Sequence, residues 1–561
     1  MQTRWQVQSK LPPTVDEALE KFPPVLRQLL FNRGYATDEE ARAFLKAKPD
    51  FDTSPWGLKD MDVAIERIIQ AIEGGEKIII YGDYDVDGIT SSALLVELLR
   101  SFGADVNAYI PDRFKEGYGI NIEALDGFLS RNVDLVISVD CGIRAIKEAE
   151  YARNLGLDLV ITDHHHPGAV LPNALAVIDP KREDDTYAEK MLAGVGIAYK
   201  IAEALMEKIG EKSSIALVES LLDLVALGTV ADLAPLEGEN HRFVRHGLRI
   251  MHQAQRQGLV SLAGVSGVNI KEASAMNIGF SLGPRLNAAG RLYSALSAYD
   301  LLMEKDLHKA GEMAQALENI NRERQSMTGT IQEQAEIIAL AADKDAFLLF
   351  AASPEFNLGV VGLAASRLAD SYYRPAIVGQ VKEEETVCSC RSIAEFHITD
   401  ALDECSELLV KHGGHAAAAG FTIRNENVGE FLQKMNKIAE RDLADVDLHP
   451  VLVADMEVPL SDLSFEMLEH LNYLEPTGYG NPRPVFVSRN LSLKSARTVG
   501  RDKSHLKLRV SDGKVDMDGI AFRLGHLKPD LPKRVDLLYT FEVNEWQGRK
   551  SLQLNVKDIK F

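Results

Sequence analysis

Residues 77–88 read Lys77-Ile78-Ile79-Ile80-Tyr81-Gly82-Asp83-Tyr84-Asp85-Val86-Asp87-Gly88. The isoleucine run has the continuous apolar character of a parallel strand that is covered on both faces. Three alternating carboxylates stand just beyond its carboxyl end, where open α/β sheets bind their ligands. Gly82 and Gly88 permit a tight turn and a close approach of the backbone. Such a turn is either a solvated acidic loop or part of a cation site, and the rest of the chain decides between the two.

Strands and helices alternate around this segment. Helix-spaced apolar residues predict helices over 61–72 and 90–99, and apolar runs predict strands over 106–110, 133–139, 157–162 and 174–178. This alternation is typical of a doubly wound parallel sheet. The last three of these strands end in polar residues, which are Asp140, Asp163-His164-His165-His166 and Asp179.

The carboxyl ends of parallel strands lie along one edge of a sheet, so these side chains are expected to meet there. One acidic strand end is unremarkable, but several at the same edge predict a metal cluster. Asp232 closes an apolar helical stretch at 222–231 and reads, on its own, as a helix-end aspartate. Carboxylates with one or two histidines suit Mn²⁺ or Mg²⁺ better than structural Zn²⁺, which favours thiolates. Two such ions about 3.5–4 Å apart can polarise a phosphodiester and generate hydroxide between them.

The bulk composition is that of an ordinary globular protein with several domains. The 561 residues exceed what one core supports, and they are 46% hydrophobic and 26% charged. The formal charge of −21 argues against a protein that coats nucleic acid by general electrostatics, but it allows a local basic channel. No apolar run is long enough for a membrane span, the first residues lack a signal-peptide core, and the four cysteines make no disulfide framework. A reducing cytoplasm is therefore expected, with no membrane association.

We divide the chain into five segments. A helical lead-in covers 1–58, the sheet and a mainly helical continuation cover 59–307, and a long helix over 308–344 connects two lobes. A smaller α/β lobe is expected at 345–450, and short alternating strands over 451–561 predict a barrel of the oligonucleotide-binding (OB) type. Residues 283–291 are predicted to form a loop whose arginines suit phosphate. Residues 413–420 are so small that another backbone can approach them closely.

The ordered set Asp83-x-Asp85-x-Asp87, Asp140, Asp163-His164-His165 and Asp232 resembles the DHH phosphoesterase superfamily. The stretch at 413–420 resembles the second domain of such proteins, called DHHA1. Two further motifs, at 113–119 and 283–291, narrow the likeness to the RecJ family of bacterial single-strand-specific 5′→3′ exonucleases. The match runs from about residue 20 to the end of the chain.

The resemblance implies a metal centre with two Mn²⁺ or Mg²⁺ ions. Their ligands would be Asp85, Asp87, Asp140, His164 and Asp232, with Asp83 as a ligand or as support for one. Asp163 would orient a histidine, and His165 would contact phosphate or move a proton. His166 matches no motif of the family.

The resemblance also implies how the strand is held. Arg113, Ser389 and Arg391 would bind the 5′-terminal phosphate, to which arginine forks are well suited. Tyr118 would stack on a base. The remaining motif residues would line the path of the scissile strand, and they are Arg285, Asn287, Arg291, Arg324, Gln325 and His415. Of these, Arg285 and His415 would be catalytic residues.

The implied activity is hydrolysis of single-stranded DNA from its 5′ end to 5′-mononucleotides, in DNA repair and recombination. One alternative is a related DHH enzyme acting on short RNA or cyclic dinucleotides, although such enzymes typically lack the barrel. Another is a non-catalytic scaffold of a replication complex, although such relatives lose metal ligands. A monomer is expected, and a RecQ-type helicase and a single-strand-binding protein are partners implied by the resemblance alone. Phe356-Asn357 departs from the family's frequent Trp-His, so the role of the family's histidine is open there.

Overall fold

The computed structural model describes residues 3–210, 214–546 and 548–561. The chain forms two compact units. The larger unit comprises Gln6–Glu318 and Val453–Phe561, and the smaller comprises Asn319–Leu452 with the N-terminal residues up to Trp5. Helix α16, Leu307–Ala342, begins in the larger unit and ends in the smaller one, and it matches the long helix expected at 308–344.

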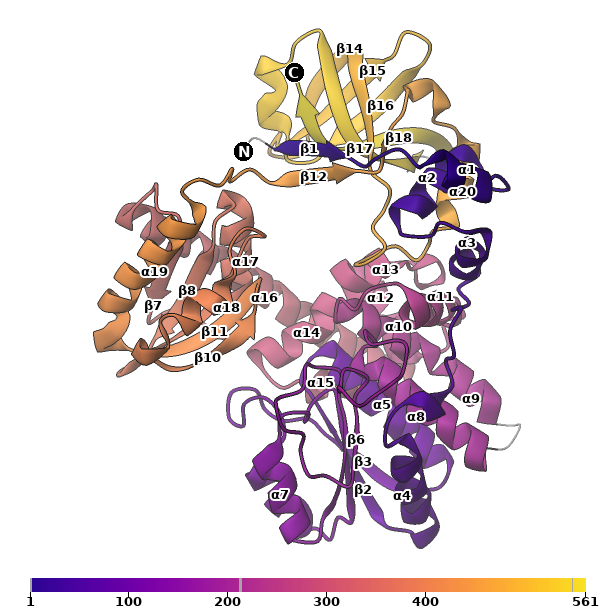
Figure 1. Ribbon diagram of the computed structural model, residues 1–561, viewed down its shortest axis with the longest axis vertical. Coiled ribbons are helices and arrows are strands. Elements are labelled where there is room, and N and C mark those ends of the chain that lie inside the picture. The colour runs from indigo at the N-terminus through magenta and orange to yellow at the C-terminus, as the bar shows by residue number, and fades with distance from the viewer. Residues whose placement is uncertain (1–2, 211–213, 547) are drawn as a thin grey trace. The chain divides into compact units, whose positions relative to one another are not determined.

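The larger unit contains a five-stranded parallel sheet, of which Figure 1 labels β2, β3 and β6. Its strand order is β3-β2-β4-β5-β6. Its strands are β2 Lys77–Gly82, β3 Asp105–Tyr109, β4 Leu135–Val139, β5 Asp158–Thr162 and β6 Ala176–Ile178. Every strand predicted in this part of the sequence is present, with ends that differ by no more than two residues. The three central strands are in register, because Gly82 pairs with Val139 and Val139 pairs with Thr162.

Helices cover both faces of this sheet, as the doubly wound prediction requires. Ile79 and Tyr81 share one apolar cluster with Phe128 of α6 (Ile122–Leu129) and Ala149 of α7 (Ile146–Asn154). Side chains alternate along a strand, so Ile78 and Ile80 face the opposite side. The helices in contact beyond the sheet are α4 Met61–Gly74, α5 Val86–Ser101 and α8 Gly194–Ile209. This sandwich buries the strands and leaves their carboxyl ends to carry the site.

The rest of this lobe is helical. Helix α10 is buried at nine of its ten positions and packs on α5 and α11. The helices after the sheet are α9 Ile215–Ser220, α10 Leu222–Ala231, α11 Gly238–Met251, α12 Gln257–Ser266, α13 Ala275–Asn277, the π-helical turn η4 Ile278–Leu282, α14 Gly283–Leu292 and α15 Leu296–Met303.

The prediction of a loop at 283–291 is wrong, because this segment is helix α14. Pro284 lies in its first turn, where proline is favoured since no helical donor is lost there. Leu286, Ala288 and Ala289 are good helix formers and are buried. Gly290 is required inside the helix by packing, since a Cβ there would lie 2.6 Å from the carbonyl oxygen of Tyr84.

The smaller unit is a second α/β lobe. Its sheet has the order β10-β11-β9-β8-β7, with β7 and β8 parallel and the other pairs antiparallel. The strands are β7 Leu349–Ser353, β8 Ala376–Val381, β9 Glu385–Arg391, β10 Leu409–His415 and β11 Ala418–Arg424. Helices α17 Val361–Tyr372, α18 Ile398–Asp403 and α19 Val428–Leu443 complete it. The small residues at 413–420 form the tip of the β10–β11 hairpin, where a Cβ on Gly414 would lie 2.4 Å from a backbone atom of Ala419.

The C-terminal strands form the expected barrel (Figure 1). Strands β14 Phe486–Val499, β15 His505–Ser511, β16 Asp516–Ala521, β18 Arg549–Lys560 and β17 Arg534–Trp546 pair in this order, and β17 closes on β14. Strand β14 is continuous but has an irregularity near Asn490, which has φ 55°.

The N-terminal helices complete the core of this barrel. Helices α2 Pro24–Asn32 and α3 Asp38–Leu45 contribute Leu26, Leu30 and Phe44 to one cluster with Phe486 and Tyr539 of the barrel, and Val15 of α1 Pro13–Ala18 packs against it. A capping box formed by Thr37 and Glu40 begins α3. Helix α20, Phe465–Asn472, joins the same cluster. Within the described ranges, no helix is both long enough and apolar enough to cross a bilayer.

Candidate metal centre

Three neighbouring strands end at the same level, and each is followed by an aspartate. Register pairs the last residues of β2, β4 and β5, so Asp83, Asp140 and Asp163 begin their loops side by side. Asp140 adopts a left-handed backbone with φ 59°, a conformation that aspartate tolerates better than most residues. Asp232 arrives from a different element as the C-cap residue of α10. The convergence predicted from the sequence is therefore present.

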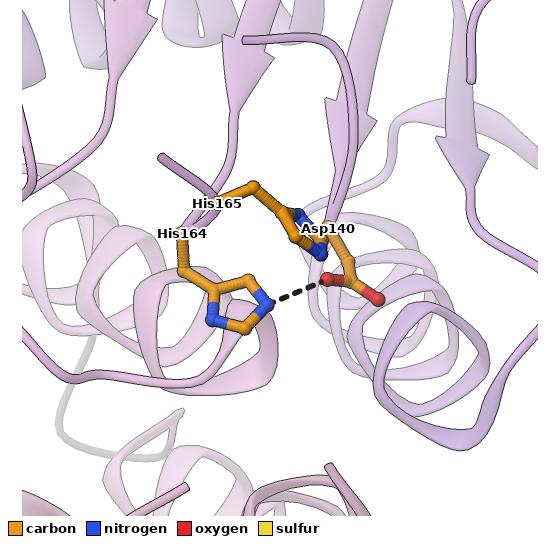
Figure 2. A group of neighbouring side chains, drawn as sticks. All are labelled: Asp140, His164 and His165. Carbon is orange, nitrogen blue, oxygen red and sulfur yellow. Dashed lines mark ion pairs between the residues drawn. The ribbon is translucent and has the colours of Figure 1, made fainter. Parts of the chain in front are cut away.

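The six predicted metal ligands lie close together. Within each of three groups the ligand atoms lie within 4.8 Å of one another: Asp83, Asp85 and Asp140; Asp87, His164 and Asp232; and Asp140, His164 and His165. His164 Nε2 is 3.0 Å from Asp140 Oδ1, the contact drawn in Figure 2. It is 3.8 Å from Asp87 Oδ2 and 3.9 Å from Asp232 Oδ2. Asp140 and His164 each belong to two of these groups, so both lie where the groups meet.

The chemistry of this donor set fits divalent cations. Asp83 Oδ1, Asp140 Oδ1 and His164 Nε2 are buried, and apart from the 3.0 Å ion-pair contact between the last two they have no hydrogen-bond partner among the described residues. Burial and the neighbouring carboxylates raise the pKa of Asp83, Asp87 and Asp140 well above the ordinary range, and burial with Asp85 raises that of Asp232 to about 7. Buried acids of this kind are stable as ions only beside positive charge, and hard oxygen-binding cations supply it.

Backbone amides fix two of the carboxylates. Asp85 is the N-cap of α5, and its Oδ1 accepts hydrogen bonds from the amides of Asp87 and Gly88 at 2.9 and 3.1 Å. Asp87 accepts hydrogen bonds from the amides of Gly194 and Val195, at 2.6 and 2.8 Å, at the N-terminus of α8. A Cβ on Gly194 would lie 2.8 Å from Asp140 Cβ, so only glycine lets this helix approach the site. This contribution was not predicted, although the glycines beside Val195 are its signal in the sequence.

The two histidines have different electrostatic surroundings. Burial and the charge of His165 lower the pKa of His164 to about 3, so its imidazole is neutral and able to bind a metal. Burial also lowers the pKa of His165, but the hydrogen bond to Asp163 at 2.7 Å and that carboxylate's charge outweigh it and raise the pKa to about 9. Asp163 also accepts hydrogen bonds from the backbone amides of Ile143 and His164, at 2.9 and 2.7 Å. Asp163 therefore holds a cationic His165 beside the cluster.

Arginine and tyrosine side chains border the cluster on one side. The guanidinium of Arg113 lies 5.0 Å from the ring centre of Tyr84, which stands between Asp83 and Asp85 in the sequence. The Tyr118 ring packs edge-on against that of Tyr84, and its hydroxyl is 3.4 Å from His165 Nδ1. Tyr118 is nevertheless 56% exposed, which leaves much of the side chain open to solvent. Sequence reasoning named Arg113 and Tyr118 but not Tyr84.

Helix α14 borders the cluster beside the first loop. Asn287 Oδ1 accepts a hydrogen bond from the amide of Val86 at 3.3 Å. Arg291 lies close enough for its charge to act on the Tyr84 hydroxyl. Arg285 is held by Glu318, with Nε 2.7 Å from the carboxylate, and by the carbonyl of Ser281. Glu318 was not identified from the sequence.

The other predicted residues belong to the smaller unit. Arg324 and Gln325 lie on α16, where Arg324 donates to Asn321 Oδ1 at 2.6 Å. Ser389 and Arg391 share one face of β9, and both lie beside Gly362 in the first turn of α17. His415 is exposed at the end of β10. Phe356 is fully buried and Asn357 Oδ1 accepts a hydrogen bond from the Gly359 amide at 2.8 Å, so this pair shapes the turn before α17.

Family models match three parts of the chain. The N-terminal domain of the DHH family matches residues 77–229, the DHHA1 domain matches 344–441, and the RecJ OB domain matches 454–558. The fold and site thus define a DHH-type phosphoesterase with a second α/β lobe and an OB barrel.

Similar proteins narrow this class to one family. The single-stranded-DNA-specific exonuclease RecJ of Bacillus subtilis is 40% identical, over 99% of this chain and 70% of the relative. RecJ of Escherichia coli is 34% identical, over 97% of this chain and 98% of the relative. The crystal structure of RecJ with Mn²⁺ from Thermus thermophilus matches with a TM-score of 0.85 and 29% identity, covering 100% of this chain and 79% of that chain. A second structure of the Thermus protein, with Mg²⁺, has a TM-score of 0.79 and 28% identity, covering 100% of this chain and 78% of that chain. The chain belongs to the RecJ family.

Proposed function

We propose that this protein is a single-stranded-DNA-specific 5′→3′ exonuclease that releases 5′-mononucleotides in DNA repair and recombination. The observation that carries the proposal is the cluster of five aspartates and His164 at the carboxyl edge of the sheet, in which Asp83, Asp87, Asp140 and His164 are buried and Asp85 and Asp232 are half-buried. Its RecJ relatives are named as exonucleases specific for single-stranded DNA, which supports the proposed substrate. The Thermus structures hold Mn²⁺ and Mg²⁺, which are the ions that the cluster fits.

Two Mn²⁺ or Mg²⁺ ions would be held by Asp83, Asp85, Asp87, Asp140, His164 and Asp232, and when bound they would polarise a phosphodiester and activate water. The remaining steps belong to the chain's own side chains. His165 is held in one orientation and kept cationic by Asp163, so it can neutralise a phosphate oxygen and hand a proton to the leaving 3′ oxygen. Arg285, fixed by Glu318, can contribute a second positive charge.

Polarity would follow from recognition of the terminal phosphate. The hydroxyl of Ser389 and the guanidinium of Arg391 lie beside the first turn of α17, and a helix N-terminus with an arginine is a natural phosphate site. Arg113, stacked on Tyr84, would provide another positive group. Tyr118 would stack on the terminal base, which any base sequence permits. Asn287, Arg291, Arg324, Gln325 and His415 would contact the rest of the scissile strand.

The test is turnover of a single strand with a 5′-phosphate in Mn²⁺. The wild-type protein should release 5′-mononucleotides from it, and a 3′-labelled duplex and a short RNA serve as parallel substrates. Asp140→Ala should abolish turnover and leave strand binding within a few-fold of wild type, because the side chain it removes is a ligand. Asp445→Ala, an exposed aspartate on the smaller unit, is the matched control and should stay fully active.

Three outcomes would contradict the proposal. Preference for the short RNA would indicate an oligoribonuclease, and binding without turnover in any metal would indicate a scaffold. Full activity of Asp140→Ala would refute the metal assignment.

The proposed partners follow from family membership alone. A RecQ-type helicase would supply single strands, and a single-strand-binding protein would present them to a monomeric cytoplasmic enzyme. Stimulation of hydrolysis on a duplex by such a helicase is the corresponding measurement.

A further inference from the structure

Three large apolar side chains are exposed near Asp232 and have no place in the proposed chemistry. Phe280 is 82% exposed, the largest fraction for a large apolar side chain in the described part of the chain. Leu233 and Tyr479 are 67% and 64% exposed. Single exposed apolar residues are ordinary on a protein surface, but these three come from distant parts of the sequence.

Packing brings the three segments together around the end of α10. Leu233 follows Asp232 directly, in a left-handed conformation with φ 62° that is costly for leucine. A Cβ on Gly279, next to Phe280, would lie 3.8 Å from Val230, and one on Gly283 would lie 3.4 Å from Ala231. The turn that carries Phe280 therefore rests on the last turn of α10.

The segment before the barrel that contains residues 478–480 packs on residues 235–236, which follow α10. The amide of Leu236 donates a hydrogen bond to the carbonyl of Tyr479 at 2.7 Å. A Cβ on Gly480 would lie 2.9 Å from Pro235, so the two segments are in close contact. Tyr479 is thus bonded to a residue that lies only four positions along the chain from Asp232, one of the predicted metal ligands.

We propose that Leu233, Phe280 and Tyr479 form a stacking surface for the bases that follow the scissile phosphate. Aromatic side chains hold single strands by stacking, which tolerates any base. The overall charge of −21 repels the phosphates of a DNA strand, so uncharged stacking contacts would add affinity that phosphate contacts alone do not supply. Leu236, which bonds Tyr479, lies four Cα–Cα steps and so at most about 15 Å from Asp232, and stacked bases rise about 3.4 Å each, so at most about four bases separate the two residues.

The inference rests on the proposed function, and its test separates the two. Phe280→Ala should weaken binding of a 5′-phosphorylated 12-nucleotide strand roughly 5- to 100-fold, measured by anisotropy in EDTA. In Mn²⁺ the same change should raise KM and leave kcat within twofold, because the reacting atoms are untouched. Hydrolysis of a dinucleotide, which places only one base beyond the scissile phosphate, should change far less than hydrolysis of the 12-nucleotide strand. Phe465→Ala, another exposed phenylalanine, is the control and should bind like wild type.

Phe280→Trp keeps the stacking face and adds a readout that does not need activity. This variant should bind like wild type, and the strand should quench the added tryptophan fluorescence relative to the wild-type background. Equal binding by wild type and Phe280→Ala, with no quenching in Phe280→Trp, would overturn the stacking surface and leave the exonuclease intact. A wild-type protein that neither binds nor hydrolyses single strands would overturn both.

Discussion

Replacing Asp232 by asparagine should stabilise the metal-free protein while abolishing its activity. Asp232 lies among ionisable carboxylates, and burial together with the charge of Asp85 raises its pKa from 3.8 to about 7. Asparagine keeps the shape of the side chain and removes the charge. Active sites often carry such a conflict between stability and function.

The magnitude follows from the pKa shift. One unit corresponds to about 1.4 kcal/mol, so ionised Asp232 costs the metal-free fold on the order of 2–4 kcal/mol at pH 7.5, the lower figure allowing for charge shared across the cluster. Because the folded pKa lies above the unfolded value of 3.8, this cost is absent below pH 3.8, grows as the pH rises and levels off above pH 7. Asp232→Asn removes the cost entirely.

Thermal unfolding in EDTA and in saturating Mn²⁺ measures the effect. In EDTA at pH 7.5 the variant should melt several degrees above wild type, and the gap should shrink at pH 5. In Mn²⁺ the order should reverse, because binding to the folded state stabilises only the protein that keeps its ligands. Asp445→Asn removes an exposed charge and should match wild type in both buffers. A variant that melts below wild type in EDTA would refute the reasoning.

Further predictions concern Gly194 beside the site, the buried His241 of α11 and the core of the barrel. Gly194→Ala places a Cβ 2.8 Å from Asp140 Cβ and should weaken Mn²⁺ binding in calorimetry and lower kcat at least tenfold, whereas unchanged binding would show that α8 can move away. Burial lowers the pKa of His241 to about 4, so below pH 6.5 the fold should lose up to about 3 kcal/mol as the pH falls to 4; His241→Gln should flatten this loss in urea titrations. Tyr539→Phe removes a buried hydrogen bond to Ser488 of 2.8 Å and should cost about 1 kcal/mol in urea unfolding, a cost that disappears if Ser488→Ala is already present.

The metal centre could be predicted from the sequence because its signal is local. Each of Asp83, Asp140 and Asp163 follows a strand that is recognisable from its own residues, and parallel strands bring their carboxyl ends to one edge. Asp232 lacked such a signal, since it ends a helix, and only its place in the family pattern assigned it to the site.

The parts that could not be predicted depend on contacts between distant segments. The glycines of α14 suggested a loop. They are instead needed because Gly290 packs against the backbone of Tyr84 and Gly283 packs against the end of α10, contacts that no local pattern reveals. The anchoring of Asp87 by the amides of Gly194 and Val195 spans more than 100 residues. The apolar residues of α1 to α3 predicted helices, but their pattern did not predict that these helices pack on the barrel.

The core shared by the N-terminal helices and the barrel has a consequence for synthesis on the ribosome. Leu26 and Leu30 leave the exit tunnel early, whereas their partner Phe486 follows about 450 residues later. At roughly 5–20 residues per second, these leucines wait on the order of 20–90 s for the surface that buries them. During this interval the nascent chain carries an unpaired apolar helix pair, an apt target for chaperones that hold emerging polypeptides. The barrel, which is translated about 450 residues after these helices, is thus the domain that brings them to their final place.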